Sequence, residues 1–314
     1  MSIAKTFFRQ WNHWWFREAP PHAMAILRIL FGFWILLFIG LKLPHADLLF
    51  STQGLVIPYD YTIHFGSIPG VAVLQDFLTP LSPTTALLMV SLHVACLAAF
   101  TAGFRTRLFA LMAFLFFLYE YNLSYHHMGT SYNRLFLFFS FLFLFAESGK
   151  AFSIDMLLRH GSFFAWEPIS VFFQRIIAVQ ITATYLGVGL QKVWLPDWSN
   201  GSMLYYSFQS MWATPVAYWL LSLRPAMWIF DAMVFIVKAF EVALPFGLWH
   251  RKTRLWFMVG GVLFHVGISL FLAAIWWFYA MIACYIMFFE PEEILHMLRA
   301  RFPRIPESPA SAHR

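Results

Sequence analysis

Eight stretches of the chain are long, apolar and nearly free of charge, and polar loops separate them. A helix needs about 20 apolar residues to cross the hydrocarbon core of a bilayer. The ranges that meet this length at least loosely are 24–43, 84–103, 108–121, 134–146, 169–190, 227–248, 255–272 and 274–289. The third, fourth and eighth of them are short. The pattern therefore predicts an all-α, polytopic transmembrane helix bundle of about eight spans.

The composition supports this prediction and excludes a soluble globule. Of the 314 residues, 61% are hydrophobic and only 11% are charged, whereas about a quarter of the residues in soluble domains are charged. The net charge of +6 is spread over short loops, which is typical of membrane orientation and not of a nucleic-acid-binding face. Cys96 and Cys284 lie within apolar stretches, so we expect no disulfide and no cysteine metal site.

The loop charges also predict an orientation. With the N-terminus inside, fourteen Lys and Arg residues fall in inner segments, and only four, Lys42, Arg134, Lys192 and Arg224, fall in outer ones. This bias favours a multi-pass protein of the cell membrane, in bacteria the inner membrane, with both termini cytoplasmic. It also places Lys192 on the side where positive charge is scarce.

The pattern divides the chain into residues 1–19, 20–290 and 291–314. Within the first region, Phe7, Phe8, Trp11, Trp14 and Trp15 share one helical face, which predicts a helix lying in the membrane interface, in contact with lipid. The middle region is the transmembrane bundle, with two long outer loops at 44–83 and 191–226, where function is commonly found. The last region is expected to be a short amphipathic helix followed by a disordered tail over 303–314.

Ionisable residues inside the apolar stretches require partners, because a charge at mid-bilayer costs at least about 3 kcal/mol. Arg28 and Arg175 lie a turn or two into their stretches, and each either reaches back to the interface or pairs within the bundle. Lys238 and Glu241 are three residues apart and share a helical face. They either form a structural ion pair, or Glu241 pairs with another helix and sets a proton route.

Histidines occur both inside the stretches and in a loop. His93 and His265 are near mid-depth, where a histidine commonly makes an interhelical hydrogen bond. We expect this role for His93, whereas His265 is equally a candidate for chemistry. His126 and His127 are adjacent in an outer loop, without the spacing or the carboxylates of a metal site, so the sequence predicts no metal.

One stretch combines polar residues with glycines at the end of a predicted helix. Tyr185, Gly189 and Lys192 follow at spacings of four and three along one stripe, and Gln180 precedes them. Gly189 would let another helix, or a flat ligand, approach the backbone closely. Lys192 is either an anchor whose ammonium reaches the lipid headgroups or a partly desolvated amine that acts as a general base.

Several segments occur together, in an order found in a known family. They are AILRILFGFW at 25–34, LLFSTQGLVIP at 48–58, GFRTR at 103–107, SIDMLL at 153–158, VQITATYLGVGLQKVWLPDW at 179–198, FEVALPFGLWHRKTR at 240–254 and FHVGISLFL at 264–272. From about residue 21 to residue 289, the chain resembles the horizontally transferred transmembrane (HTTM) domain family, whose best-known relative is the vitamin K-dependent gamma-glutamyl carboxylase.

The resemblance implies a chemistry for two residues. In the carboxylase, a lysine that follows a Gly-Val pair deprotonates vitamin K hydroquinone, and its position matches Lys192. A histidine of a Phe-His pair matches His265. The resemblance therefore implies a quinone or hydroquinone as cofactor. It makes Lys192 and His265 catalytic. We expect Gln180, Tyr185, Gly189 and Asn133 to line the cofactor site.

The chain departs from the carboxylase pattern at the start of the fourth stretch. The carboxylase has an Asn-His pair there, whereas this chain has Thr-Ser-Tyr-Asn at 130–133, and its histidines stand earlier, at 126 and 127. The resemblance thus covers deprotonation of a quinol better than it covers the carboxylation half of the reaction.

Two functions from different classes fit these observations. The first is a membrane-embedded, carboxylase-like enzyme that modifies a peptide or small-molecule substrate in an outward-facing cavity, with Lys192 as base. The second is a non-catalytic membrane partner in maturation or export of a secreted peptide, with a small thiol oxidoreductase as its partner. A transporter is less favoured, because no inverted repeat or pair of broken helices stands out.

Overall fold

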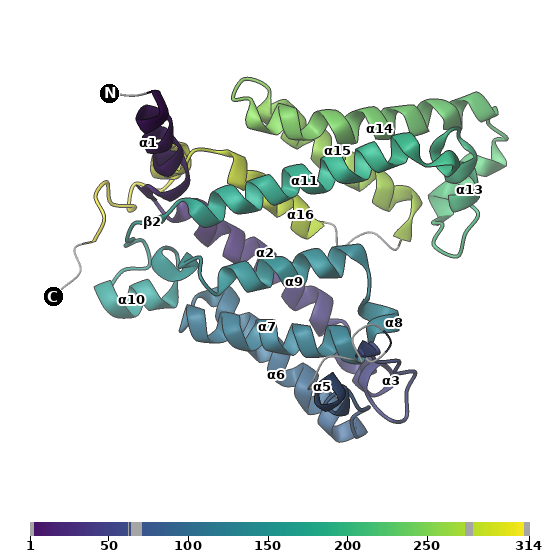
Figure 1. The fold of residues 1–314 in the computed structure, drawn as a ribbon, viewed down its shortest axis with the longest axis horizontal. Helices are drawn as coiled ribbons and strands as arrows, with labels where there is room; N and C mark the ends of the chain where they lie inside the picture. Colours follow the sequence, from purple (N-terminus) through teal and green to yellow (C-terminus); the bar gives the residue numbers. More distant parts are fainter. Residues whose placement is uncertain (1–2, 62, 64–70, 274–278, 311–314) are drawn as a thin grey trace. The chain divides into compact units, whose positions relative to one another are not determined.

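The structure, a computed structural model, describes residues 3–61, 63, 71–273 and 279–310, and the chain divides into two compact units. Unit 1 comprises Met1–Phe173 and Pro291–Arg314, and unit 2 comprises Gln174–Glu290. Both units consist almost entirely of helices (Figure 1). The predicted all-α class is therefore confirmed for the described residues, apart from two very short strands.

Unit 1 contains most of the helices before residue 173 and the last helix of the chain. Its described helices are α1 (Ile3–Phe16), α2 (His22–Gly40), η1 (Leu43–His45), α3 (Ala46–Phe50), α5 (Val71–Asp76), α6 (Pro83–Ala102), α7 (Thr106–Leu123), α8 (Tyr125–Met128), α9 (Ser131–Phe143), η2 (Ser148–Lys150), α10 (Ile154–His160) and α17 (Pro291–Arg301). Strands β1 (Glu18–Ala19) and β2 (Ile169–Ser170) pair antiparallel, with Ala19 opposite Ile169.

Helix α2 packs on α6, α6 on α7, and α7 on α9. The core between α2 and α9 is aromatic: Phe31 contacts Phe136, Phe139 and Phe143, with ring centroids 5.6–5.9 Å apart. Gly32 brings α2 close to α6, because a Cβ at this position would collide with Thr101. The bundle thus combines large rings with one small residue at the closest approach.

Local sequence explains where the helices of unit 1 begin and end. The side chains of Ser82, Thr130 and Ser153 each accept a hydrogen bond from the backbone N–H three residues on, and so cap α6, α9 and α10. Pro83 is the first residue of α6, where its missing N–H costs nothing. Helix α6 ends at Gly103, whose φ of 73° is in the left-handed region that favours glycine.

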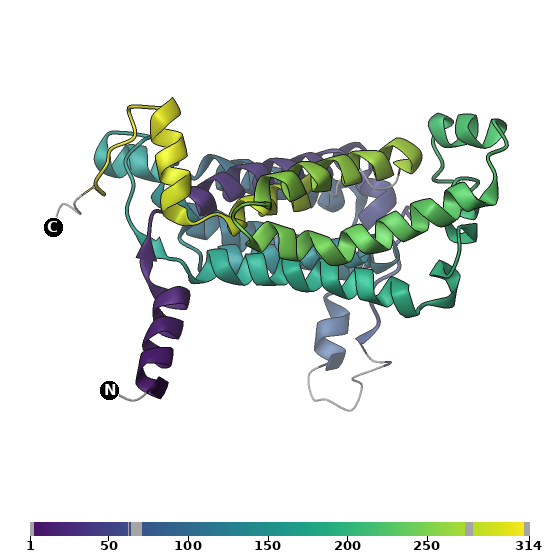
Figure 2. The ribbon, with the colours of Figure 1, turned by 90° about the horizontal axis from the view of Figure 1, so that it is seen from above.

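The N-terminal helix is confirmed as α1, and Figure 2 shows it projecting from the rest of unit 1. Its exposed aromatic side chains include Phe7, Phe8 and Trp11. Its base is held by the β1–β2 pair and by two hydrogen bonds from Arg17 to Glu292 of α17. The interfacial position of α1 stays a prediction.

The C-terminal region differs from the expected disordered tail over most of its described length. After α17, Ile305 is buried in an apolar cluster with Trp166, and the Trp166 indole donates to the Pro306 carbonyl at 3.0 Å. The backbone N–H of Ala310 donates to the Trp166 carbonyl at 2.8 Å. One apolar residue and a tryptophan partner order the segment despite its polar composition. Residues 311–314 of the predicted tail lie outside the described residues.

Unit 2 is formed by three long helices and several short ones. Its elements are α11 (Phe172–Trp194, which begins two residues before the unit), η3 (Pro196–Trp198), α12 (Ser202–Ser207), α13 (Pro215–Ser222), α14 (Met227–Trp249), α15 (Arg254–Phe271), α16 (Tyr279–Ala283) and η5 (Cys284–Phe288). Helix α14 packs on α15 and α12, and α15 packs on α13 and α16. The predicted long loop at 191–226 therefore folds mainly into short helices.

In the part of the chain that the structure describes, each of the eight predicted stretches contains helix, and residues 274–278 of the eighth lie outside that part. Those long and apolar enough to cross a membrane are His22–Phe50, which continues α2 through α3, Pro83–Ala102, Phe172–Trp194 and Arg254–Phe271, with Tyr279–Phe288 as a shorter apolar helix. Helix α14 has the length but carries Asp231, Lys238 and Glu241. The structure thus supports a helical membrane protein, and the total of about eight spans stays a prediction.

Arg28 is the largest fully buried side chain of unit 1, and the pairing interpretation of it is confirmed. Its guanidinium donates to the carbonyls of Ser148, Ala151 and Phe152, the last at 2.5 Å. Gly103 lies directly against it, since a Cβ there would be 3.1 Å from Arg28 Cζ. The five donors of a guanidinium suit this task, because they can satisfy several carbonyls of an irregular loop at once.

We predict that Arg28→Met destabilises the protein by about 3 kcal/mol, because it leaves buried carbonyls without a charged donor. Thermal unfolding in detergent, with Arg9→Met on the exposed face of α1 as the matched control, measures this. An Arg28→Met protein as stable as the control would contradict the structural role.

Candidate functional site

The side chain of Lys192 forms a buried ion pair in unit 2. Its Nζ lies 2.6 Å from both carboxylate oxygens of Glu241 of α14, and the side chains are only 15% and 7% exposed. Charge-assisted hydrogen bonds of this length are among the strong ones in proteins. The ion pair therefore disfavours two of the predicted roles, Lys192 as an interfacial anchor and Glu241 as the partner of Lys238. It agrees with the alternative prediction that Glu241 pairs with a residue of another helix.

The segment after α11 explains why Lys192 is largely covered although it is close to the end of its helix. Glu241 is 14 residues into α14, about 20 Å from its start, and the chain after Trp194 continues along that first half of α14. Lys238 donates to the Trp198 carbonyl at 2.8 Å, and Asp231 accepts from the Gly201 N–H at 2.6 Å. The Trp198 ring covers the ammonium, with its centroid 4.6 Å from Lys192 Nζ.

Gly189 sets the distance between α11 and α14. A Cβ at Gly189 would be 3.0 Å from Val242 Cγ2 and 3.1 Å from Glu241 Cβ, which is tighter than nearly all real contacts. The glycine is therefore used for close helix packing, one turn before Lys192, and α14 takes the space beside it. Gly187 has no such neighbour within 4 Å.

Three polar side chains meet in the same unit around Tyr185, two turns before Lys192 on α11. The Tyr185 hydroxyl lies 2.6 Å from His265 Nε2 and 2.7 Å from the Tyr285 hydroxyl. All three residues are buried. Gly261, one turn before His265 on α15, leaves room for Tyr285, because a Cβ there would be 2.5 Å from its hydroxyl.

Tyr185 lies one turn before Gly189, against which Glu241 packs. The structure therefore places two groups of polar residues on successive turns of α11, the Lys192–Glu241 pair and the Tyr185–His265–Tyr285 cluster. Such a row of hydrogen-bonding side chains inside an apolar unit can hold a charge, or carry a proton, without exposing it to lipid.

The remaining sequence-predicted site residues have local partners. The Gln180 amide donates to the Thr184 hydroxyl of its own helix at 3.3 Å. Asn133 is buried in unit 1 and donates to the Met128 carbonyl at 2.8 Å. Arg175 pairs with Glu290 at 2.6 Å, which again favours pairing over snorkelling. Within the described residues, no group of three or more His, Cys, Asp or Glu side chains could hold a metal ion.

The sequence pattern did not predict Tyr285 as a site residue, and it did not predict that Trp198 covers Lys192. For Tyr285, the hydroxyl group inside an apolar stretch could have indicated a polar partner. The role of Trp198 depends on the turn of the chain after α11, which no periodicity indicates.

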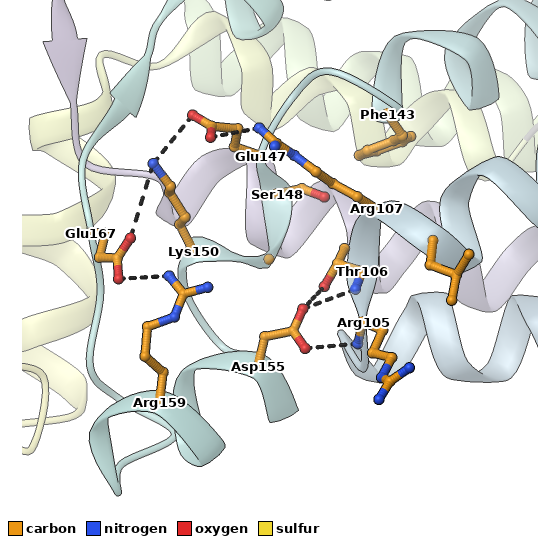
Figure 3. A pocket seen from close by; sticks show the side chains of 12 residues that line it. Arg105, Thr106, Arg107, Phe143, Glu147, Ser148, Lys150, Asp155, Arg159 and Glu167 are labelled. Atoms are coloured by element: carbon orange, nitrogen blue, oxygen red, sulfur yellow. Dashed lines mark hydrogen bonds and ion pairs between the residues drawn. The ribbon is translucent and has the colours of Figure 1, made fainter. Parts of the chain in front are cut away.

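The charged hollow in unit 1 shown in Figure 3 has a volume of about 580 Å³. Its side chains alternate in charge. Arg107 contacts Glu147 at 2.7 Å, Glu147 contacts Lys150 at 3.3 Å, Lys150 contacts Glu167 at 4.0 Å, and Glu167 contacts Arg159 at 2.8 Å. Each charged side chain of this series has a neighbour of opposite sign, which indicates a structural network of ion pairs.

Two family-like segments, GFRTR and SIDMLL, meet beside this hollow. Asp155 accepts hydrogen bonds from the backbone N–H groups of Arg105 and Thr106 and from the Thr106 hydroxyl, at 2.6–2.9 Å. These N–H groups begin α7, so the carboxylate satisfies the helix N-terminus and matches its dipole. Arg105 has a φ of 41°, an uncommon conformation for a residue with a Cβ, which this bonding stabilises.

A model of the HTTM domain family matches residues 16–292. Neither a curated protein nor a solved structure matches the chain. The match covers most of the chain, so the protein belongs to the HTTM domain family. Together with its apolar helices, this makes it a membrane protein of that family.

Breaking the Lys192–Glu241 pair should destabilise the protein strongly. We expect Lys192→Met and Glu241→Gln each to cost about 3 kcal/mol, since each leaves a buried polar group without its partner. The double variant should cost about 2 kcal/mol less than the sum of the two. Unfolding of all three variants in detergent micelles measures this coupling, and strictly additive effects would show that the two side chains do not interact.

The acid sensitivity of unit 1 should depend on Glu167. Burial raises its pKa, but hydrogen bonds from His160 and Arg159 outweigh this, so its pKa is lowered below 4.5. A depressed carboxyl pKa adds stability above the unfolded value, and this stability is lost as the pH falls through the folded value. Glu167→Gln should therefore flatten the loss of stability below about pH 4.5, and an unchanged pH profile would contradict this.

Proposed function

We propose that the protein is a membrane-embedded, carboxylase-like enzyme in which Lys192 accepts a proton from a bound, lipid-soluble molecule. The observation that carries this proposal is the largely buried Lys192–Glu241 pair, which lies under Trp198 and two turns along α11 from Tyr185 and its partner His265. Membership of the HTTM family adds support, because the lysine and the histidine fall at the positions that resemble the carboxylase.

The pair offers a way for a lysine to act as a base inside an apolar unit. In a medium of low dielectric, separated charges are costly, so transfer of the ammonium proton to the carboxylate competes with the ion pair. Lys192 then presents a neutral amine, while Glu241 holds the proton one hydrogen bond away. The amine can accept a second proton from an acidic hydroxyl placed against it.

The donor set fits a hydroquinone. Such a cofactor, when bound, would supply an acidic hydroxyl and the reducing electrons. Lys192 would face that hydroxyl, and the Trp198 indole, 4.6 Å from Nζ, would offer a flat apolar surface beside it. Glu241 positions the lysine, and the hydrogen-bonded cluster of Tyr185, His265 and Tyr285 would supply polar groups two turns further into the unit. The space at Gly189 is taken by α14, so we omit Gly189 from the cofactor contacts.

The carboxylate that holds Lys192 also supports the second candidate function. A fully formed ion pair between α11 and α14 is sufficient to lock the two helices, without chemistry. The protein would then be a non-catalytic membrane partner in maturation or export of a secreted peptide. The two functions differ in whether a guanidinium can replace the amine, because arginine can pair with Glu241 but cannot act as a base near neutrality.

We predict that Lys192→Arg keeps the fold, and that both Lys192→Arg and Lys192→Met lower activity about 100-fold or more, the range attributed to a general base. The measurement is oxygen consumption by purified protein on addition of reduced vitamin K. It is combined with extraction of any co-purifying quinone from wild type and variants. Lys252→Met, an exposed loop lysine, is the matched control.

Full activity of Lys192→Arg would overturn the enzyme proposal in favour of a structural lysine. Loss of activity together with loss of a co-purifying quinone would extend the role of Lys192 to binding. Detergent size-exclusion profiles identify variants that fail to fold.

A further inference from the structure

Unit 1 contains a second buried pair of ionisable side chains, which the proposed function does not use. His93 of α6 and Glu120 of α7 are both 0% exposed, with His93 Nδ1 2.9 Å from Glu120 Oε1. The interhelical hydrogen bond expected for His93 is thereby confirmed. Phe116 of α7 stacks on the imidazole, at 5.7 Å between ring centroids. The cost of burying a carboxylate so deeply indicates a reason beyond packing.

Half of the hydrogen-bonding capacity of this pair is unused by the protein. Among the described residues, His93 Nε2 and Glu120 Oε2 find no hydrogen-bond partner, and neither does the buried Ser124 Oγ. Ser124 follows the last residue of α7, and its backbone N–H donates to the Glu120 carbonyl at 3.0 Å. Buried polar atoms left unpaired cost about 1–3 kcal/mol each. Neighbouring atoms of this kind are commonly bridged by ordered water, which needs two to four polar partners.

A route leads from this pair to the surface through Lys42. The Lys42 ammonium interacts electrostatically with Glu120 and lies 2.6 Å from His127 Nε2. Lys42 is buried, whereas His127, on the short helix α8, is exposed. Burial of part of the imidazole and the charges of Lys42 and His126 lower the pKa of His127 to about 4. At neutral pH, His127 is therefore neutral and accepts the hydrogen bond from Lys42.

The other titratable groups at this end of unit 1 have partners of their own. Tyr121 lies near Arg134 of α9, and its ring packs edge-on against Tyr125 at 5.6 Å between centroids. The Tyr61 hydroxyl donates to Asn122 Oδ1 at 2.7 Å. The Tyr125 ring packs edge-on against Tyr59. His126 is exposed and lies beside His127, with ring centroids 6.5 Å apart.

We propose that His93 and Glu120 form a proton-binding site inside unit 1, completed by ordered water, and that Lys42 and His127 connect this site to the aqueous phase at α8. The loop charges predict that this end faces the outside of the cell. The site is separate from the proposed chemistry at Lys192, so either proposal can fail while the other stands.

The transfer needs only proton movement along the Lys42–His127 contact and through the proposed water. Lys42 gives one proton of its ammonium to His127 Nε2, and the Nδ1 proton of His127 passes to water. The neutral Lys42 amine then takes the proton held by the His93–Glu120 pair, through the ordered water. Uptake runs through the same steps in reverse. No bond between heavier atoms changes, and no oxidant or reductant is required.

Infrared difference spectroscopy of the full chain in lipid nanodiscs tests the site, by stepping the pH between about 4 and 9. We expect a C=O band of a protonated carboxyl that grows on acidification and shifts in D₂O. This band should disappear in Glu120→Gln and persist in Glu241→Gln, the variant of the buried carboxylate in unit 2. Absence of any Glu120-dependent band and of its deuterium shift would overturn the proposal.

The route is tested by the rate at which that band shifts after transfer to D₂O. His127→Leu and Lys42→Arg should slow the shift about tenfold or more, because leucine removes the acceptor and a guanidinium does not release its proton. His126→Leu, beside the route, is the matched control and should exchange like wild type. Lys42→Arg keeps the positive charge near Glu120, so we expect this variant to fold. Equal rates in wild type, His127→Leu and Lys42→Arg would exclude the route.

Discussion

The rest of the structure depends on the cost of placing a charge where water cannot reach it. An ionised side chain at mid-bilayer costs at least about 3 kcal/mol, and the buried charges of this chain are met by partners on other elements. Arg28 bonds to carbonyls near η2, Arg175 to Glu290, and Lys192 to Glu241. Because each pair joins separate elements, it fixes which ones pack and at what height. The charges therefore specify the fold together with the aromatic core.

The pair that best stabilises unit 2 is also its best candidate for chemistry. An ammonium held by two 2.6 Å hydrogen bonds is well stabilised, which opposes its use as a base. The low dielectric acts against this stabilisation, because it reduces the free-energy difference between the ion pair and a neutral amine beside a neutral acid. A ligand that excludes water from the pair would reduce this difference further. The proposed reactivity would then depend on ligand binding.

Much of the fold follows from local sequence, whereas the ion pairs between helices do not. Apolar runs gave the positions of the helices, and Ser82, Thr130 and Gly103 explain their ends. Glu241 shows the limit. The i, i+3 spacing predicts Lys238 as the partner of Glu241. Gly189 instead brings α11 close to α14, and Lys192 forms the pair with Glu241. Spacing along one helix is visible in a sequence, whereas a contact across 49 residues depends on how two helices pack.

Both units contain a buried carboxylate that pairs with a basic side chain, and in each case an aromatic ring covers the base. In unit 2, Glu241 pairs with Lys192, whose ammonium lies over the Trp198 ring. In unit 1, Glu120 pairs with His93, on which Phe116 stacks. The charged network around Glu147 and Glu167 differs, because each of those carboxylates pairs with an arginine within 3 Å. A carboxylate that shares its proton with a neutral-capable base can change state, and one held by guanidinium cannot. This difference in partner separates the two candidate reactive sites from the structural one.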